Sequence, residues 1–297
     1  MRKNKTVYNC INAIVVLLTI FFFIREFYGK DGLPGMGDVS AVVLLVVTVF
    51  LVHAIKACRL YLALYGNGLS FSEYLKTYAK VTPVSVILPF KLGEFFRMYC
   101  YGEKLGSFLK GIVIILFDRF MDTAALVTMI FLIRGLSGGR ILYPVYFFVL
   151  FLVTALLIYL VFPGVYSFWK KWFLGAKATE NKLRALKLLE MLNRVYKEIR
   201  SVSAGRGAIL YFMSVAAWAV ELGSVALRTG LSGVSDAGAS VAGSSLAGDV
   251  LSDYLMCAMG SGSSQLLREF VFVSVVMMVA LYVVIKILRL SPQDDRG

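Results

Sequence analysis

Two short groups of charged residues lie in or beside apolar stretches of the chain and are its strongest candidates for chemistry. Glu94 and Arg97 are three residues apart, and Asp118 and Asp122 are four apart, with Arg119 next to the first of them. Spacings of three and four place side chains on one face of a helix. A charge inside a bilayer costs at least about 2.5–3.5 kcal/mol on insertion scales, so a cluster of such charges is a functional hypothesis by default.

The chemistry that these side chains suit is phosphate binding. We expect the carboxylates to orient Arg97 and Arg119 and to leave guanidinium N–H groups that bind a phosphate in bidentate fashion. Lys91 lies shortly before the first group and adds a further positive charge. The alternative is structural: the two groups neutralise each other as a buried salt-bridge network that only locks the surrounding segments together.

Three more charged residues are candidates in the second half of the chain. Glu221 stands alone in an apolar stretch, so its partner must come from elsewhere; Arg97, Arg119 and Arg268 are the candidates. A protonated Glu221 is the other option, and it would allow proton coupling. Arg268 and Glu269 follow an interrupted apolar segment, as Glu94 and Arg97 do in the first half.

One further polar group is expected to have no part in the chemistry. His53 is followed by Lys56 and Arg59 at the end of an apolar run. We expect His53 to cap that end or to face lipid headgroups. We expect Lys56 and Arg59 to extend their charged ends to the membrane surface.

The composition indicates that these charges belong to a membrane protein. Of the 297 residues 59% are hydrophobic and only 16% are charged, and the mean hydropathy is +0.78. Soluble domains have about 45–50% apolar and about 25% charged residues, so the chain is predicted to be an integral membrane protein. The net charge of +13 is then explained by topology and by attraction to anionic lipid headgroups, without nucleic acid as a partner.

Apolar runs of roughly 17–25 residues are long enough to cross a bilayer as helices. The chain has six candidates, and together they predict an all-α, multi-pass membrane protein in a single membrane domain over residues 1–297. The six are residues 6–24, 39–55, 111–133, 141–162, 208–227 and 270–288.

Basic residues predict the orientation, because cytoplasmic loops of membrane proteins carry an excess of Lys and Arg. Residues 163–206 hold ten Lys or Arg against three Glu, so this segment is expected in the cytoplasm. Six crossings then place both termini in the cytoplasm. Leucines recur in this segment at helical spacing, which predicts an amphipathic surface helix that is either a membrane-lying connector or a docking element.

Two apolar segments are too short to cross and are interpreted as re-entrant. Residues 81–90 form one. Pro83 and Pro89 are expected to break this segment at its two ends, so residues 74–93 are interpreted as a re-entrant hairpin. Residues 250–267 form the other, interrupted around Gly260 and Gly262. With these segments, residues 1–135 and 140–290 have the same order of elements. This predicts a 3+3 inverted-topology repeat, in which interrupted segments mark the substrate site.

The charged motifs also resemble those of a known family. The pattern P-x-x-x-G-E-x-x-R, followed by an acidic residue, Arg and then Asp, is similar to the signature of the lysylphosphatidylglycerol synthase transmembrane-region family. The matching residues are Pro89, Gly93, Glu94, Arg97, Asp118, Arg119 and Asp122. The second half departs from the family, because residues 259–269 lack its proline and its spacing.

The resemblance implies a flippase-like membrane domain that moves a phospholipid or polyprenyl-phosphate-linked headgroup across the bacterial inner membrane. It is expected to be a stand-alone member without the aminoacyl transfer domain. Its partner would be a lipid with an anionic phosphate headgroup. A second copy of the chain, or a separate lipid-modifying enzyme, is a further candidate partner.

Two other function classes stay open. A membrane transferase acting on a lipid-linked substrate would use Asp118 and Asp122 to hold a divalent cation, but the sequence has one His and none of the common hydrolase or zinc motifs. An accessory subunit of a lipid-modifying complex is the other class. The sequence holds no nucleotide-binding P-loop, and we expect no cofactor, no metal and no catalytic residue.

Overall fold

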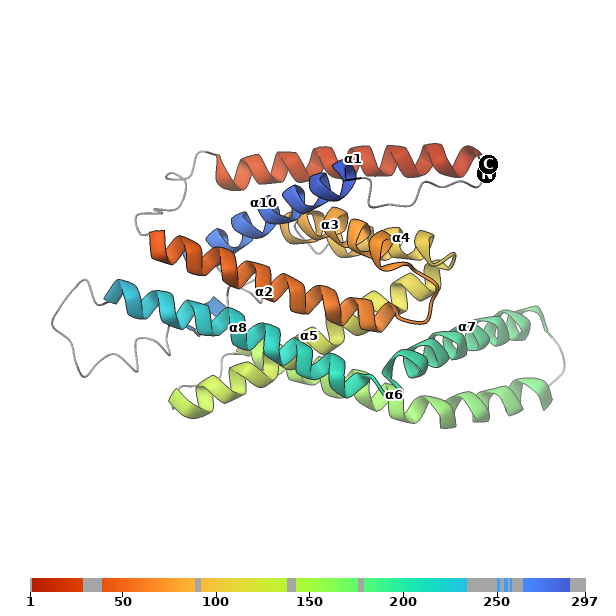
Figure 1. Ribbon diagram of the computed structural model, residues 1–297. Coiled ribbons are helices and arrows are strands. Elements are labelled where there is room, and N and C mark those ends of the chain that lie inside the picture. Colours follow the sequence, from red (N-terminus) through yellow and green to blue (C-terminus); the bar gives the residue numbers. More distant parts are fainter. Residues whose placement is uncertain are drawn as a thin grey trace.

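The protein is a bundle of helices (Figure 1). The computed structural model describes residues 2–28, 39–88, 92–137, 143–175, 179–233, 250–251, 254–255, 257 and 264–288. Within these ranges there is no β-strand. The helices are α1 (Arg2–Phe27), α2 (Val39–Leu64), α3 (Phe71–Ile87), α4 (Leu92–Lys104), α5 (Phe108–Ser137), α6 (Tyr143–Gly175), α7 (Glu180–Ser203), α8 (Gly207–Gly233) and α10 (Gln265–Ile287).

Five of these helices are long and apolar enough to cross a membrane: α1, α2, α6, α8 and α10. They overlap five of the six expected spans. The sixth, residues 111–133, lies in α5, whose 30 residues extend about 45 Å but include Asp118, Arg119 and Asp122. A multi-pass helical membrane protein is therefore confirmed, while the number of crossings stays a prediction.

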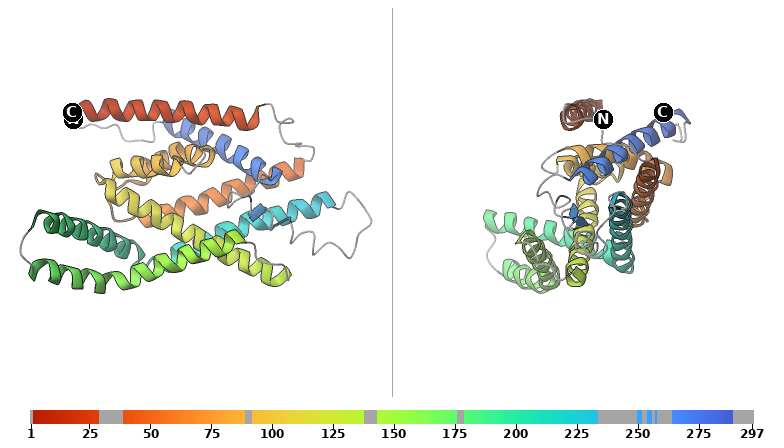
Figure 2. Two further views of the ribbon diagram at one scale, coloured as in Figure 1. Left: turned by 180° about the vertical axis from the view of Figure 1, so that it is seen from behind. Right: turned by 90° about the vertical axis from the view of Figure 1, so that its left-hand side faces the viewer.

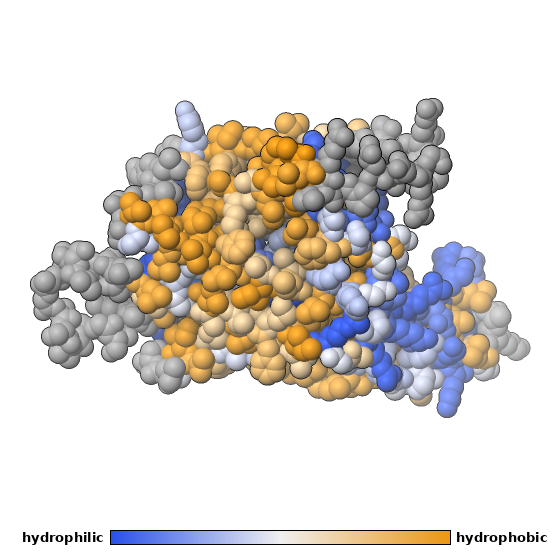
Figure 3. Space-filling view, in the orientation of Figure 1, coloured by the Kyte–Doolittle hydropathy of each residue, from blue (hydrophilic) through white to orange (hydrophobic). Residues whose placement is uncertain are grey.

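The outer surface supports placement in lipid. Leu17 and Phe21 on α1 are more than half exposed, and so are Phe147 and Leu160 on α6. Figure 3 shows apolar side chains over much of one face and polar ones gathered toward the side of α7. A continuous apolar surface of this kind suits hydrocarbon and not water.

Two expected boundaries are wrong. The second helix does not end at residue 55, because α2 continues to Leu64 and carries Lys56 and Arg59 into the bundle. The segment 163–206 is not a loop with one surface helix: α6 continues to Gly175, and α7 packs back against it. Tyr196 of α7 lies 5.1 Å from Tyr159 and 5.2 Å from Phe162 between ring centres. The expected amphipathic helix exists, but it is half of a helical hairpin.

The contacts of Glu190 predict a pH dependence for this α6–α7 hairpin. Hydrogen bonds from Lys170 and Tyr166 hold the pKa of the Glu190 carboxyl below its usual value of 4.5. A lowered pKa means that the contact is fully present above pH 4.5 and is lost as the pH falls through the folded-state pKa. Spin labels on α6 and α7 are expected to show a broader distance distribution at acidic pH.

Glu190→Gln is the control for that measurement, because it removes the titrating group. The distance distribution of this variant is expected to be the same at neutral and acidic pH. A wild-type distribution that does not change with pH would show that Glu190 does not hold the hairpin.

The pair α3 and α4 forms a short hairpin within the bundle. Their 17 and 13 residues extend only about 26 Å and 20 Å, less than the ~30 Å hydrocarbon core. The Ser70 hydroxyl accepts a hydrogen bond from the Glu73 amide and caps the start of α3. Pro83 lies inside α3, so the expectation that it breaks the segment is wrong. Pro89 lies outside the described residues.

Gly93 allows the two helices of this hairpin to touch. A Cβ atom at Gly93 would lie 2.3 Å from the Cα of Ser85 and 2.5 Å from the carbonyl oxygen of Val84. No real Cβ approaches backbone this closely. The start of α4 therefore lies directly against the end of α3. This contact sets the position of the first turns of α4, which carry Glu94 and Arg97.

The packing order places α2 and α5 at the centre (Figure 2). The main helix pairs are α2 with α8, α3 with α10, α4 with α5 and α5 with α8. One apolar core surrounds α3 and α4, and a second joins α5 and α8 to Tyr254 and Leu255. The start of α1 lies on the side of the molecule where α7 lies, and α10 runs toward that side (Figure 1).

Candidate functional site

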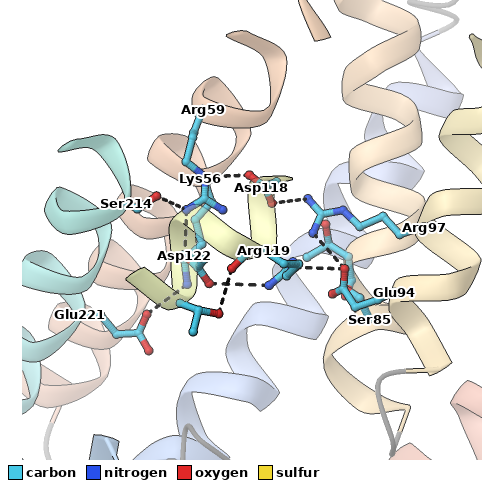
Figure 4. A network of polar contacts seen from close by, with 12 residues as sticks. Lys56, Arg59, Ser85, Glu94, Arg97, Asp118, Arg119, Asp122, Ser214 and Glu221 are labelled. Carbon is cyan, nitrogen blue, oxygen red and sulfur yellow. Dashed lines mark hydrogen bonds and ion pairs between the residues drawn. The ribbon is translucent and has the colours of Figure 1, made fainter. Parts of the chain in front are cut away.

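Arg59 is the centre of a buried polar network where α2, α5 and α8 meet (Figure 4). Its Nε donates to Asp118 Oδ1 at 2.8 Å. Its Nη1 donates to Asp122 Oδ1 at 2.8 Å and to the Ser214 hydroxyl at 2.6 Å. Asp118 and Asp122 lie one helical turn apart on α5, so a single guanidinium bridges both carboxylates. Arg59 therefore joins three helices that are far apart in sequence.

Arg97 of α4 is also buried, but its guanidinium has fewer hydrogen-bond partners than that of Arg59. Its nearest carboxylate oxygens are Glu94 Oε2 at 3.8 Å and Asp118 Oδ2 at 3.9 Å, beyond hydrogen-bond distance. Its guanidinium carbon lies 5.9 Å from the centre of the Tyr78 ring. Within the described ranges, Arg97 Nε and Asp118 Oδ2 have no hydrogen-bond partner. Arg97 is therefore held mainly by charge and by an aromatic face.

Arg119 of α5 joins α4 to this network from its more open side. Its Nε donates to Glu94 Oε2 at 3.0 Å, and its Nη1 lies 3.7 Å from Asp122 Oδ2. The five residues singled out by spacing, Glu94, Arg97, Asp118, Arg119 and Asp122, are thus brought into one cluster.

Glu221 extends the network along α8. Lys56 Nζ donates to Glu221 Oε2 at 3.3 Å, and the Tyr254 hydroxyl donates to Glu221 Oε1 at 2.7 Å. The expectation that Glu221 pairs with Arg97, Arg119 or Arg268 is therefore wrong. The reason is the continuation of α2, which brings Lys56 into the bundle beside α8.

The other predicted residues of the second half lie apart from the network. Glu269 pairs with Arg228 of α8, and Gln265 Nε2 donates to Glu269 Oε1 at 3.3 Å. Arg268 Nε lies 3.7 Å from Glu26 Oε1 of α1. Lys91, Gly260 and Gly262 lie outside the described residues.

His53 is also inside the bundle. Its imidazole is buried, its Nδ1 lies 3.3 Å from the Tyr78 hydroxyl, and its ring stacks on Phe270 at 6.5 Å. The expectation that His53 caps a helix end or faces headgroups is wrong, because α2 continues for more than two further turns. His53 and Arg97 both contact Tyr78, His53 through the Tyr78 hydroxyl and Arg97 through the Tyr78 ring.

The network is balanced in charge. In the part of the chain that the structure describes, it contains four cations, Lys56, Arg59, Arg97 and Arg119, and four carboxylates, Glu94, Asp118, Asp122 and Glu221. The further positive charge expected from the sequence is that of Lys91, which lies outside the described residues. Among the described residues no group of three His, Cys, Asp or Glu is placed to hold a metal ion.

Comparison with known proteins places this chain in a family. The model of the lysylphosphatidylglycerol synthase TM region matches residues 11–280, from α1 to α10. The chain belongs to this family. No curated protein and no solved structure matches it. Membership and the five apolar helices together identify a multi-pass membrane protein with a function related to membrane lipids.

In this member of the lysylphosphatidylglycerol synthase TM-region family, sequence reasoning missed three residues of the network. They are Lys56 and Arg59 of α2 and Ser214 of α8; the Tyr254 hydroxyl, which donates to Glu221, was missed as well. A signal for the first two was present, because no Gly or Pro follows them until Gly66 and Leu60–Leu64 continue the apolar helix pattern. Lys56 and Arg59 also stand three apart, the spacing of Glu94 and Arg97, which places both side chains on one face of a helix.

Proposed function

We propose that the chain is a lipid translocase that moves an anionic phospholipid, or a polyprenyl-phosphate-linked headgroup, across the bacterial inner membrane. The observation that carries this is the network of four cations and four carboxylates among helices whose outer faces are apolar. A polar headgroup needs such a site to cross hydrocarbon, since each unpaired charge there costs several kcal/mol. The tails need no site and stay in the lipid.

In this proposal the carboxylates orient the cations as well as neutralising them. They keep each Arg and Lys oriented while no lipid is bound, so that the cations do not need to be ordered when the phosphate arrives. Asp118 and Asp122 are bridged by Arg59, and this arrangement favours a role for them in holding Arg over a role in holding a divalent cation. A transferase mechanism that uses the two carboxylates for a metal therefore gains no support from this geometry.

We infer an inverted repeat from the packing. The first short hairpin packs against α10, the last helix of the second half. Tyr254 and Leu255, from the second interrupted segment, pack against α5, the last helix of the first half. These exchanged contacts on either side of the α2–α8 pair support a repeat of residues 1–135 and 140–290. Transporters built in this way bind substrate at the repeat interface.

We propose that both termini and α7 face the cytoplasm. The basic residues of 163–206 support this orientation. The side of the molecule that holds α7 also holds the start of α1 (Figure 1). Labelling of single cysteines placed in α7 by a membrane-impermeant reagent is expected only after the cells are opened, and labelling of intact cells would reverse the orientation.

The transport proposal is tested in sealed vesicles that contain a trace of fluorescent phosphatidylglycerol. Wild-type protein is expected to move the labelled headgroup between leaflets, as measured by the fraction that an impermeant reductant quenches. Glu94→Gln and Arg119→Gln are expected to slow this movement about tenfold or more, because each removes a charged hydrogen bond of the network.

Arg184→Gln is the matched control, since Arg184 belongs to an exposed ion pair on α7. It is expected to transport at the wild-type rate. Equal rates in wild-type and protein-free vesicles, across several anionic lipids, would contradict the proposal. Mass spectra of the recovered lipid provide the second readout, because a chemically altered product would identify a membrane transferase instead.

A further inference from the structure

The four cations of the network differ in how far they can be reached. The side chains of Arg59 and Arg97 are only 3% and 5% exposed. Those of Lys56 and Arg119 are 23% and 39% exposed. A ligand that enters from outside the network would therefore meet Lys56 and Arg119 first.

Lys56 also has unused hydrogen-bonding capacity. An ammonium group has three N–H donors, and within the described residues Lys56 donates one hydrogen bond, to Glu221 at 3.3 Å. Its Nζ lies 5.3 Å from the centre of the Trp218 ring, which restricts its position without using a donor. Arg59, in contrast, directs three hydrogen bonds to fixed partners.

Asp122 lies between the two accessible cations. Its Oδ1 accepts from Arg59 at 2.8 Å, whereas its Oδ2 lies 3.7 Å from Arg119, too far for a hydrogen bond. Asp122 also interacts electrostatically with Lys56. Figure 4 shows Lys56 on one side of Asp122 and Arg119 on the other. Asp122 Oδ2 therefore faces Arg119 without forming a hydrogen bond to it.

We propose that Lys56 is a ligand of the substrate phosphate and forms, with Arg119, a two-cation clamp on its oxygens. This inference rests on the proposed function and deepens it. The phosphate replaces Asp122 Oδ2 as the anion nearest Arg119, while Asp122 stays paired with Arg59 through Oδ1. Arg119 supplies paired N–H groups and Lys56 supplies a compact point charge. Arg59 and Arg97 are positioning residues that hold the carboxylates.

The position of Trp218 beside Lys56 provides a binding assay. The chain has three tryptophans, Trp169, Trp172 and Trp218, so Trp169→Phe with Trp172→Phe leaves one reporter. The full chain in detergent is titrated with short-chain phosphatidylglycerol, with short-chain phosphatidylcholine and with inorganic phosphate. Calorimetry runs in parallel, because its signal does not depend on the tryptophan.

Phosphatidylglycerol is expected to change the emission of Trp218. Lys56→Gln is expected to raise the Kd by calorimetry about tenfold or more, and Lys56→Arg to keep most of the affinity because it retains the charge. The double variant Lys56→Gln with Glu221→Gln removes the pair together and leaves no stranded carboxylate. It is expected to bind as weakly as Lys56→Gln alone.

Two results would overturn the role of Lys56: wild-type affinity in Lys56→Gln, or recovery of wild-type affinity in the double variant. The second would mean that Lys56 only neutralises Glu221. If inorganic phosphate binds as tightly as the lipid and Lys56→Gln weakens that binding, the clamp is supported but lipid transport is contradicted. Phosphatidylglycerol transport with unchanged affinity in Lys56→Gln would keep the proposed function and reject the clamp.

Discussion

Arg59→Ala is expected to lower the free energy of unfolding by about 3–5 kcal/mol, the usual cost of removing one partner from a buried ion pair. Asp118 and Asp122 would lose the guanidinium that bridges them, and Ser214 would lose its donor. Because Asp118 is buried, its carboxylate has little access to water that could replace Arg59. The contact between α2, α5 and α8 is expected to loosen as a consequence.

The loss of stability is measured by heating the protein in detergent and monitoring its unfolding by size-exclusion chromatography. Arg184→Ala is the matched control, because its ion pair with Glu180 is exposed and is expected to contribute less than about 1 kcal/mol. A second variant, Arg59→Lys, keeps a charge but cannot bridge two carboxylates with a planar group. It is expected to lie between Arg59→Ala and wild type. Wild-type stability in Arg59→Ala would show that water reaches the two carboxylates.

Gly93→Ala is expected to displace the α3–α4 hairpin and to abolish most of the transport. The added Cβ would lie 2.3 Å from the Cα of Ser85 and 2.8 Å from its amide nitrogen. Both atoms belong to the backbone, so no side-chain rotation relieves the overlap. Overpacking of this kind typically costs about 1–3 kcal/mol and sometimes more. The shift would also move Glu94, the residue that follows Gly93, away from Arg119.

Gly164→Ala on α6 is the control for Gly93→Ala. It also lies inside a helix, but nothing lies within 4 Å of its added Cβ. This variant is expected to be as stable as wild type or more stable by up to about 1 kcal/mol, the helix preference of Ala over Gly. Thermal unfolding and the vesicle assay are measured on both variants. Normal transport in Gly93→Ala would mean that the hairpin tip is free to move without affecting the site.

The sequence predicts the helices well wherever apolar runs are long. Five of the six expected spans coincide with helices able to cross a membrane, because length and apolarity alone decide that property. The clustering of Glu94 and Arg97 with Asp118, Arg119 and Asp122 also agrees with the prediction from their spacing. Each of these residues has at least one partner less than about 30 residues away, so local helix geometry brings most of the cluster together.

Prediction fails where a charge has a distant partner. Lys56 and Arg59 look like the end of a membrane helix because two cations in apolar surroundings are expensive. Their carboxylate partners, Asp118, Asp122 and Glu221, lie 59 to 165 residues away. Only the packing of α2 against α5 and α8 reveals that the charges are neutralised. Because the sequence does not show these distant pairs, it predicts that α2 ends too early and that Glu221 has no partner nearby.

Within the part of the chain that the structure describes, the network's equality of four cations and four carboxylates has a consequence for how the membrane voltage acts on the protein. A voltage exerts force on net charge, at about 2.3 kcal/mol for each elementary charge moved through 100 mV. A rearrangement that carries the empty network as a whole moves no net charge through the field. Once an anionic headgroup is bound, the same rearrangement carries its charge. In the proposed cycle the loaded step therefore senses the voltage and the return step does not, so the direction of net transport follows the cell's electrical polarity.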